Sequence, residues 1–151
     1  MSDLKIGIVG AAGRMGRMLV KQVSETAGCV ISGGTEPAGS PFAGKDITAL
    51  AGLDASGILI GEDPAALFET ADAVIDFTAP EATIAHARLA AEKGKIHIIG
   101  TTGLTNEQQA QVTACGDRAV IVQGANMSLG VNLLAQLTRK VAHILDDEFD
   151  I

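Results

Sequence analysis

The most constraining feature of the sequence is a glycine-rich turn near the N-terminus, which joins a short apolar run to a helical pattern. The run over residues 5–9 is rich in β-branched residues, as a buried strand is. After the turn, Met15, Leu19 and Val23 recur at helical spacing, and Gly28 predicts the end of that helix. The chain must therefore pass from a strand to a helix through one tight turn.

The same order of strand and then helix repeats along the chain. Apolar runs predict further strands from Cys29 to near Glu36 and over residues 58–60, 73–77, 96–99 and 119–122. Helices are predicted to begin at Pro64, Pro80, Thr105 (as a cap) and about Leu129, whereas residues 37–57 are predicted to be mostly loop. Almost wholly apolar strands are typical of a sheet that is covered on both faces. We therefore predict an α/β fold, a Rossmann-like doubly wound parallel sheet with helices on both faces, in one domain over residues 1–151.

Three glycines of the turn have separate physical roles. Gly10 permits the sharp exit from the strand, Gly13 allows close approach to the backbone, and Gly16 lets the helix lie against the sheet. A pyrophosphate would then bind to free amides at the positive end of the helix. The spacing G-x-x-G-x-x-G is a variant of the dinucleotide fingerprint, so we predict a dinucleotide-binding domain. A turn that serves packing alone is the alternative.

A carboxylate at the end of the second predicted strand bears on which dinucleotide binds. Glu36 lies 20 residues after Gly16, where a carboxylate accepts hydrogen bonds from the ribose hydroxyls of NAD and repels the 2′-phosphate of NADP. Arg14 could offset that repulsion through a charge-assisted hydrogen bond. The alternatives are a solvated loop carboxylate for Glu36 and a surface helix cation for Arg14.

Two segments of small residues follow later predicted strands, at the edge where ligands of such sheets bind. Gly100-Thr101-Thr102-Gly103 offers amides and hydroxyls to the nicotinamide ribose or carboxamide. Residues 124–128 offer backbone groups to the carboxamide. The alternatives are an ordinary turn for the first segment and a helix cap by Asn126 or Ser128 for the second.

Hydride transfer to a carbonyl or imine needs a proton donor. The motifs described so far supply no such catalytic group. His86 falls within a predicted helix, His97 within a strand and His143 on the last helix, so each is interpreted as structural or solvated. The chain has no Tyr, which excludes a Tyr-Lys pair, and its three His and two Cys make a zinc site an unfavourable interpretation. We predict no catalytic residue and no metal ligand.

The charge of −7 disfavours nucleic acid and anionic membranes as partners. No apolar stretch is long enough to span a membrane, and residues 1–5 do not resemble a secretory signal. Cys29 and Cys115 are interpreted as reduced core thiols. We therefore expect a cytoplasmic protein.

Four segments together resemble the 4-hydroxy-tetrahydrodipicolinate reductase (dihydrodipicolinate reductase) family of bacterial lysine and diaminopimelate biosynthesis. They are Gly10–Gly16, Asp76-Phe77-Thr78 with Pro80, Gly100-Thr101-Thr102-Gly103, and Ala125-Asn126-Met127-Ser128 with Gly130-Val131-Asn132. The resemblance covers nearly the whole chain but only the N-terminal nucleotide-binding domain of the family.

The resemblance implies a reaction and a set of cofactor-binding residues. Family members reduce a cyclic imine dicarboxylate with NADH or NADPH and are usually cytoplasmic homotetramers. Residues 10–15 would hold the pyrophosphate, Glu36 the adenosine ribose, residues 100–102 the nicotinamide side and residues 124–127 the carboxamide region. The cofactor-binding residues predicted in this way are Gly10, Ala11, Ala12, Gly13, Arg14, Met15, Glu36, Gly100, Thr101, Thr102, Gly124, Ala125, Asn126 and Met127.

Two departures from the family pattern matter. Pro37 follows Glu36 where members that use both cofactors often carry Arg, so NADH is favoured, with NADPH as the alternative. The family's His-His-x-x-Lys stretch and Pro-Ser-Gly-Thr segment do not occur in residues 1–151. We therefore expect the C-terminal substrate domain, with most tetramer contacts, to be absent from this chain, which would bind NAD(H) without turnover.

Two other functions remain open at this point. One is a stand-alone NAD-binding or redox-sensing module. The other is a different two-domain dehydrogenase, such as an aspartate dehydrogenase, for which Gly-Thr-Thr-Gly and Ala-Asn-x-Ser are not expected at these places.

Overall fold

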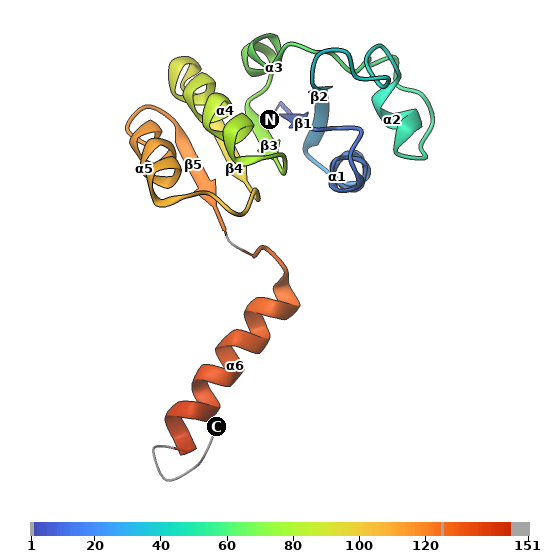
Figure 1. The fold of residues 1–151 in the computed structure, drawn as a ribbon. Helices are drawn as coiled ribbons and strands as arrows, with labels where there is room; N and C mark the ends of the chain where they lie inside the picture. Colours follow the sequence, from blue (N-terminus) through green and yellow to red (C-terminus); the bar gives the residue numbers. More distant parts are fainter. Residues whose placement is uncertain (1, 125, 146–151) are drawn as a thin grey trace.

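The computed structural model describes residues 2–124 and 126–145. One sheet of five parallel strands has the order β2-β1-β3-β4-β5 (Figure 1). The strands are β1 (Leu4–Val9), β2 (Cys29–Thr35), β3 (Ala73–Asp76), β4 (Ile96–Ile99) and β5 (Val120–Gln123). The helices are α1 (Arg14–Ser24), α2 (Ile47–Leu50), α3 (Pro64–Thr70), α4 (Pro80–Lys93), α5 (Asn106–Cys115) and α6 (Leu129–Leu145).

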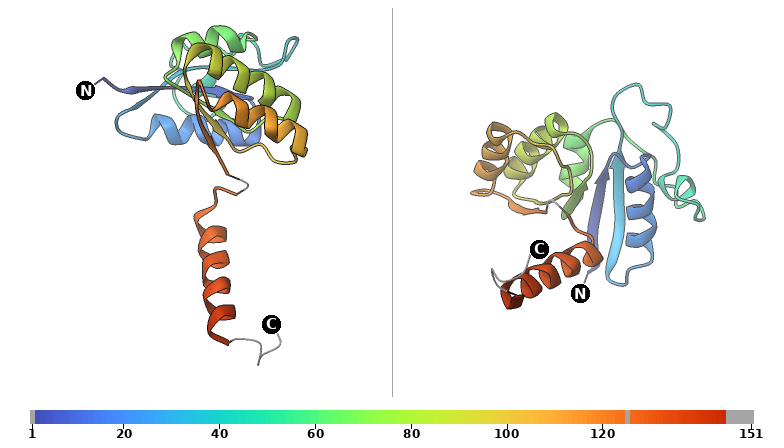
Figure 2. Two further views of the ribbon diagram at one scale, coloured as in Figure 1. Left: turned by 90° about the vertical axis from the view of Figure 1, so that its left-hand side faces the viewer. Right: turned by 60° about the horizontal axis from the view of Figure 1, so that its bottom comes forward.

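Helices cover both faces of the sheet. α1 and α2 lie on one face, and α3, α4 and α5 lie on the other (Figure 2). On the first face Ile8 of β1 packs in one core cluster with Val20 of α1, and on the second Val74 of β3 packs with Phe68 of α3. The predicted Rossmann-like, doubly wound sheet is confirmed.

Local sequence signals set the helix ends as predicted. The Asp63 carboxylate accepts a hydrogen bond from Ala65 N at 2.8 Å, which caps α3. Thr105 and Gln108 form a capping box at the start of α5. Gly94 ends α4 with a φ of 64°, a left-handed conformation that glycine adopts at little cost.

Two expected boundaries differ from the structure. Residues 58–60 make no strand of the sheet; the bridges here join Thr35 to Gly61 and Asp46 to Leu59. The loop before them contains the one-turn helix α2, held by hydrogen bonds from Thr48 N and Ala49 N to the Asp46 carboxylate. The hydrogen bonds that the Ala49 N–H and the Thr48 hydroxyl donate to this carboxylate lower the pKa of Asp46 to about 2. The backbone groups of residues 58–60 therefore bond to residues 44–47 around an isolated antiparallel bridge and not to a strand of the sheet.

The predicted last helix forms, but it stands away from the sheet (Figures 1 and 2). Its predicted apolar face, formed by Leu134, Leu137, Val141 and Ile144, is at least half exposed at every position. None of the described side chains of α6 is buried. The apolar face of α6 is therefore correctly predicted, but no surface within residues 2–124 and 126–145 buries it.

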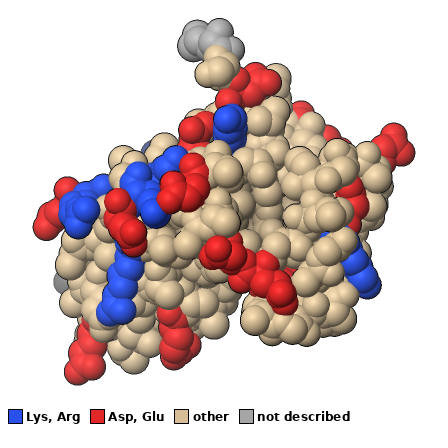
Figure 3. Space-filling view, turned by 90° about the horizontal axis from the view of Figure 1, so that it is seen from above, with Lys and Arg blue, Asp and Glu red and all other residues tan. Residues whose placement is uncertain are grey.

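Other sequence-based expectations concern the surface and the thiols. On the face drawn in Figure 3, Lys and Arg side chains lie among Asp and Glu side chains. Cys29 and Cys115 are free and half-buried rather than fully buried. No helix in the described part of the chain is long and apolar enough to cross a membrane.

Candidate functional site

The loops that follow the strands meet at one edge of the sheet. β1 pairs with β2 on one side and with β3 on the other, so the chain leaves the sheet in opposite directions at this point. In open α/β sheets, ligands bind in the crevice at such a reversal of strand order. The candidate site is therefore expected beyond the carboxyl ends of β1 and β3.

The glycine turn after β1 is packed so closely that side chains are excluded. A Cβ on Gly16 would lie 2.2 Å from the Gly10 oxygen and 2.7 Å from Ala11 backbone atoms. Gly10 has a φ of 69°, and its N–H donates to the Thr35 oxygen at 2.8 Å, which ties the turn to β2. Gly16 therefore allows α1 to start against the turn, as predicted.

The start of α1 presents backbone N–H groups in which a pyrophosphate would fit. Gly13 caps the helix without a side-chain bond, and the described residues offer no acceptor to the N–H groups of Arg14 and Met15. The Ala12 N–H, which was expected to be free, donates to Glu36 Oε1 at 2.8 Å. One predicted phosphate-binding amide is therefore occupied, and the Glu36 carboxylate joins the end of β2 to the glycine turn.

A second arginine lies against the same turn, and sequence reasoning missed it. Arg17 Nε donates to the Ala12 oxygen at 2.8 Å, and its guanidinium carbon lies 5.3 Å from the Phe42 ring centroid. Arg14, the cation expected near the ribose, is exposed and makes no hydrogen bond through its side chain to another described residue. Because Arg17 is one helical turn after Arg14, its position on α1 was the available signal.

Two clefts adjoin the glycine turn and the start of α1. The first cleft, with a volume of about 410 Å³, is lined mainly by apolar atoms. The second cleft, of about 490 Å³, brings Met15 together with loops after β3, β4 and β5. The first is formed chiefly by Gly10, Glu36, Pro37, Thr78, Ala82 and His86, and the second by Met15, Phe77, Gly100, Gly124, Asn126 and Met127.

The two threonine hydroxyls of the loop after β4 were both expected to face the ligand, but the structure places them differently. A Cβ on Gly100 would lie 2.0 Å from the Phe77 ring, so glycine is required at this position. The Thr101 side chain is buried and bonded inward, not toward the clefts. Thr102 is exposed and lines a shallow hollow that also includes Gly124. Only the second hydroxyl is thus accessible at the surface.

Residues 124–128 combine a lining role with helix capping. Asn126 Oδ1 accepts a hydrogen bond from Ser128 N at 2.8 Å, and Ser128 Oγ accepts one from Val131 N at 3.4 Å. Ser128 therefore caps α6, whereas Asn126 bonds the residue before the helix; Asn126 and Met127 also line the second cleft. The predicted residue Ala125 lies outside the described residues.

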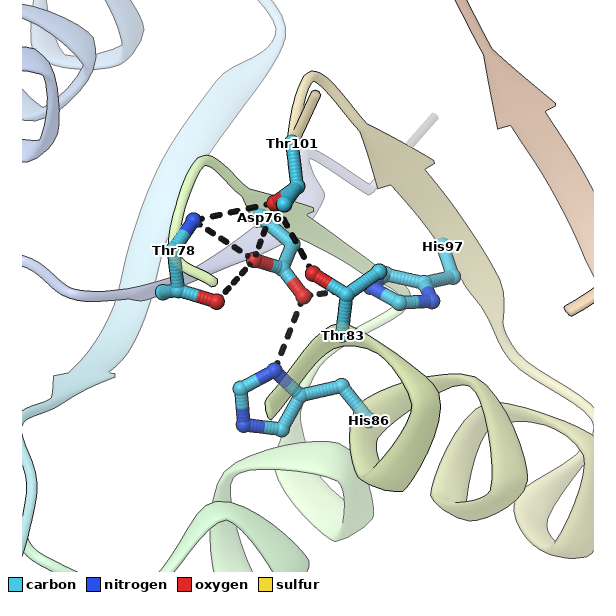
Figure 4. Close-up of polar contacts among 6 residues, drawn as sticks. All are labelled: Asp76, Thr78, Thr83, His86, His97 and Thr101. Carbon is cyan, nitrogen blue, oxygen red and sulfur yellow. Dashed lines mark hydrogen bonds and ion pairs between the residues drawn. The ribbon is translucent and has the colours of Figure 1, made fainter. Parts of the chain in front are cut away.

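A buried carboxylate joins the loops after β3 and β4 (Figure 4). Asp76 Oδ1 accepts hydrogen bonds from Thr78 N at 3.0 Å, Thr78 Oγ1 at 2.6 Å and Thr101 Oγ1 at 3.3 Å. Asp76 Oδ2 faces His86 Nδ1 at 2.8 Å and His97 Nε2 at 3.1 Å. Burial alone would raise the pKa of Asp76, but the hydrogen bonds from His86, His97 and Thr78 outweigh it and hold that pKa well below its usual range.

The same three side chains have the composition of a metal site, since their ligand atoms lie within 4.8 Å of one another. Both imidazole–carboxylate distances are those of hydrogen bonds. We therefore interpret Asp76, His86 and His97 as a hydrogen-bonded cluster.

The three histidines have different surroundings. His97 is fully buried, and its structural interpretation is consistent with this position. His143 is exposed on α6. His86 was also interpreted as structural or solvated, yet α4 carries it to the wall of the first cleft, beside Gly10 and Glu36. The sequence signal was its place in the helix that directly follows Asp76.

Comparison with known proteins identifies the family. The family model described as dihydrodipicolinate reductase, N-terminus, matches residues 4–127. A 4-hydroxy-tetrahydrodipicolinate reductase of Rhodopseudomonas palustris (strain TIE-1) is 50% identical over all 151 residues, and one of Bradyrhizobium diazoefficiens is 49% identical. The chain spans 56% of the length of each of these relatives.

Solved structures show the same fold. A dipicolinate-bound dihydrodipicolinate reductase from Paenisporosarcina sp. TG-14 superposes with a TM-score of 0.72 at 20% identity, over 93% of this chain and 54% of that one. An aspartate semialdehyde dehydrogenase with NADP from Candida albicans gives a TM-score of 0.59 at 18% identity, over 83% of this chain and 43% of that one. Because the family model covers most of the chain, the protein belongs to the dihydrodipicolinate reductase family and corresponds to its N-terminal part.

Proposed function

We propose that this chain is the cofactor-binding part of a 4-hydroxy-tetrahydrodipicolinate reductase, which transfers hydride from NAD(P)H to a cyclic imine dicarboxylate. The observation that carries the proposal is the position of two clefts beside one helix N-terminus, at the reversal of strand order. A dinucleotide has two ring systems joined by a pyrophosphate, and this arrangement has the matching three parts.

The residues present fit each part of the cofactor. The mainly apolar first cleft suits adenine, with Glu36 next to its ribose. The N–H groups of Arg14 and Met15 suit the pyrophosphate, because they point out of a helix N-terminus. The second cleft, with Gly100 and Asn126, suits the nicotinamide end. When bound, the nicotinamide supplies the hydride.

The nearby charges favour NADH over NADPH in this proposal. The half-buried Glu36 carboxylate is held at the glycine turn by Ala12 N, so a 2′-phosphate at the adjacent ribose would meet a fixed negative charge. Arg14 and Arg17 are the cations of α1 nearest the turn that could offset it. The proposal includes residues 1–151 as one dinucleotide-binding domain, a cytoplasmic location and a homotetrameric full-length enzyme.

Calorimetric titration of the 151-residue chain with NADH tests the proposal directly. We expect saturable binding without reduction of the imine, since the described residues that line the second cleft, the proposed nicotinamide site, include no titratable side chain. Gly16→Ala should abolish binding, and Gly130→Ala on α6 is the matched control that should retain it. Robust imine reduction by this chain alone would contradict the assignment as a cofactor-binding part, and absence of NADH binding would contradict the site.

Cofactor preference has its own test. Glu36→Gln should weaken NADH binding and narrow the gap to NADPH, since it removes the charge that repels a 2′-phosphate. Glu25→Gln, an exposed carboxylate at the far end of α1, is the control. Equal affinities of the unmodified protein for both cofactors would refute the preference.

A further inference from the structure

His86 connects the buried carboxylate of Asp76 to the first cleft. Its side chain is 9% exposed and lines that cleft beside Gly10 and Glu36. One ring nitrogen, Nδ1, lies 2.8 Å from Asp76 Oδ2. The other, Nε2, points away from Asp76 in Figure 4 and has no hydrogen-bond partner among residues 2–124 and 126–145.

Asp76 determines which nitrogen of His86 carries the proton. An ionised carboxylate only accepts hydrogen bonds, so Nδ1 must donate to Oδ2. In the neutral imidazole this leaves a lone pair on Nε2. The carboxylate is fixed in orientation, because its other oxygen accepts from the Thr78 N–H and hydroxyl.

We propose that Asp76, acting through His86, makes Nε2 a hydrogen-bond acceptor in the wall of the first cleft, and that this acceptor selects the amino edge of adenine. His86 is then a binding residue and Asp76 a positioning residue. The inference rests on the proposed function, because it takes the first cleft as the adenine site.

Most of the lining of the first cleft is apolar. Besides His86, the polar side chains that line it are those of Thr35, Glu36, Glu62 and Thr78. Glu36 accepts from Ala12 N, Glu62 from Gly39 N, and Thr78 Oγ1 donates to Asp76, whereas His86 Nε2 has no such partner among the described residues. The adenine 6-amino group can donate to Nε2, whereas the 6-keto oxygen of hypoxanthine would place lone pairs against a lone pair. A mismatch of this kind in a mainly apolar cleft has a larger effect than it has in water.

The first experiment changes the ligand and leaves the protein intact. The dissociation constants of NADH and of reduced nicotinamide hypoxanthine dinucleotide are measured with the 151-residue chain. We expect the hypoxanthine form to bind about tenfold more weakly. Equal affinities, or tighter binding of the hypoxanthine form, would overturn the inference while leaving the proposed function intact. Absence of binding by either ligand would contradict the proposed function itself.

Asp76→Asn tests the positioning role. The Thr78 N–H donates to Asp76 Oδ1 at 3.0 Å and also to Thr101 Oγ1 at 3.1 Å, and it cannot change its polarity. An NH₂ group in the place of Oδ1 would face this donor, so the amide oxygen of the variant should take that place. The amide NH₂ would then face the imidazoles and force His86 to accept at Nδ1, which moves its proton to Nε2. We expect the preference to shift toward the hypoxanthine form, a change that loss of stability alone does not produce.

His97→Val is the matched control, since it removes the other imidazole from the same carboxylate oxygen without touching the first cleft. It should retain the preference for NADH over the hypoxanthine form. ¹⁵N NMR of the ligand-free protein gives an independent reading: Nε2 of His86 should lack a proton in the unmodified chain and carry one in Asp76→Asn. A protonated Nε2 in the unmodified chain would refute the inference even if both variants failed to fold.

Discussion

The first strand–helix unit and the last one contain similar apolar side chains in very different surroundings. In β1 and α1, Ile8 and Val20 are fully buried. In β5 and α6, Val120 is 58% exposed and Leu134 is 64% exposed. The difference shows that an apolar pattern predicts an element and the face it will bury, whereas burial itself requires a second surface.

Local bonds explain why α6 forms without such a surface. Ser128 Oγ accepts from Val131 N, and the Asn132 amide donates to the Asn126 and Ser128 oxygens. α1, by contrast, has no side-chain cap and is held by packing of Val20 and Val23. Capping therefore stabilises one helix and the core stabilises the other.

The largest expected effect tests this contrast in the core. Phe68→Ala removes a fully buried ring and should lower the free energy of unfolding by about 3–5 kcal/mol. Leu134→Ala on α6 should change it by less than about 0.5 kcal/mol, because that side chain is mostly solvated. Urea unfolding of both variants gives the values, and similar losses in the two would break the comparison.

Glycine substitutions sharpen the comparison at the two helix starts. Gly16→Ala brings a Cβ against the backbone of Gly10 and should cost about 1–3 kcal/mol of unfolding free energy. At Gly130 the atom nearest to an added Cβ would be Ser128 Oγ at 3.9 Å, so Gly130→Ala should be neutral or stabilise by up to about 1 kcal/mol. Thermal unfolding followed by circular dichroism measures both, and a destabilised Gly130→Ala variant would show that α6 is packed.

Acid should affect the region around β3 before it affects α6. The pKa of Asp76 is lower in the folded protein than in the unfolded chain, so its ion contributes stability above the ordinary aspartate pKa, near pH 4. That contribution is lost as the pH falls further. Asp76→Asn should be less stable than the unmodified protein at pH 7, and the gap should narrow below about pH 4. A gap that does not change with pH would contradict the ionised cluster.

The smallest effect concerns the cap of α6. Ser128→Ala removes the acceptor of Val131 N and should cost about 1 kcal/mol of helix stability. Because α6 is not packed on the sheet, helical circular dichroism should fall while the main unfolding transition stays in place. A shift of that transition would reveal coupling between α6 and the sheet.

Much of the candidate site could be predicted because a parallel sheet collects its strand ends at one edge. Gly10, Glu36, Gly100 and Gly124 do line the clefts found there. The direction of the side chains could not be predicted in the same way. Thr101 points inward to Asp76, since a buried carboxylate needs donors and this hydroxyl is within reach.

Contacts between residues that are far apart in the sequence could not be predicted either. Glu36 bonds the Ala12 amide, and Arg17 bonds the Ala12 oxygen from the next helix. His86 lines the same cleft as Gly10, although the two residues are far apart in the sequence. Periodicity carries no information about such contacts, because it describes each element by itself.

The sequence by itself determined the strand–helix alternation, the close-packed turn at Gly16 and the caps of α3 and α5, because each depends on near neighbours in the chain. Only the tertiary structure decided that Asp76 gathers two histidines, that His86 reaches the first cleft and that α6 stands exposed. These features depend on which surfaces meet in space, and that depends on strand order and packing rather than on local pattern.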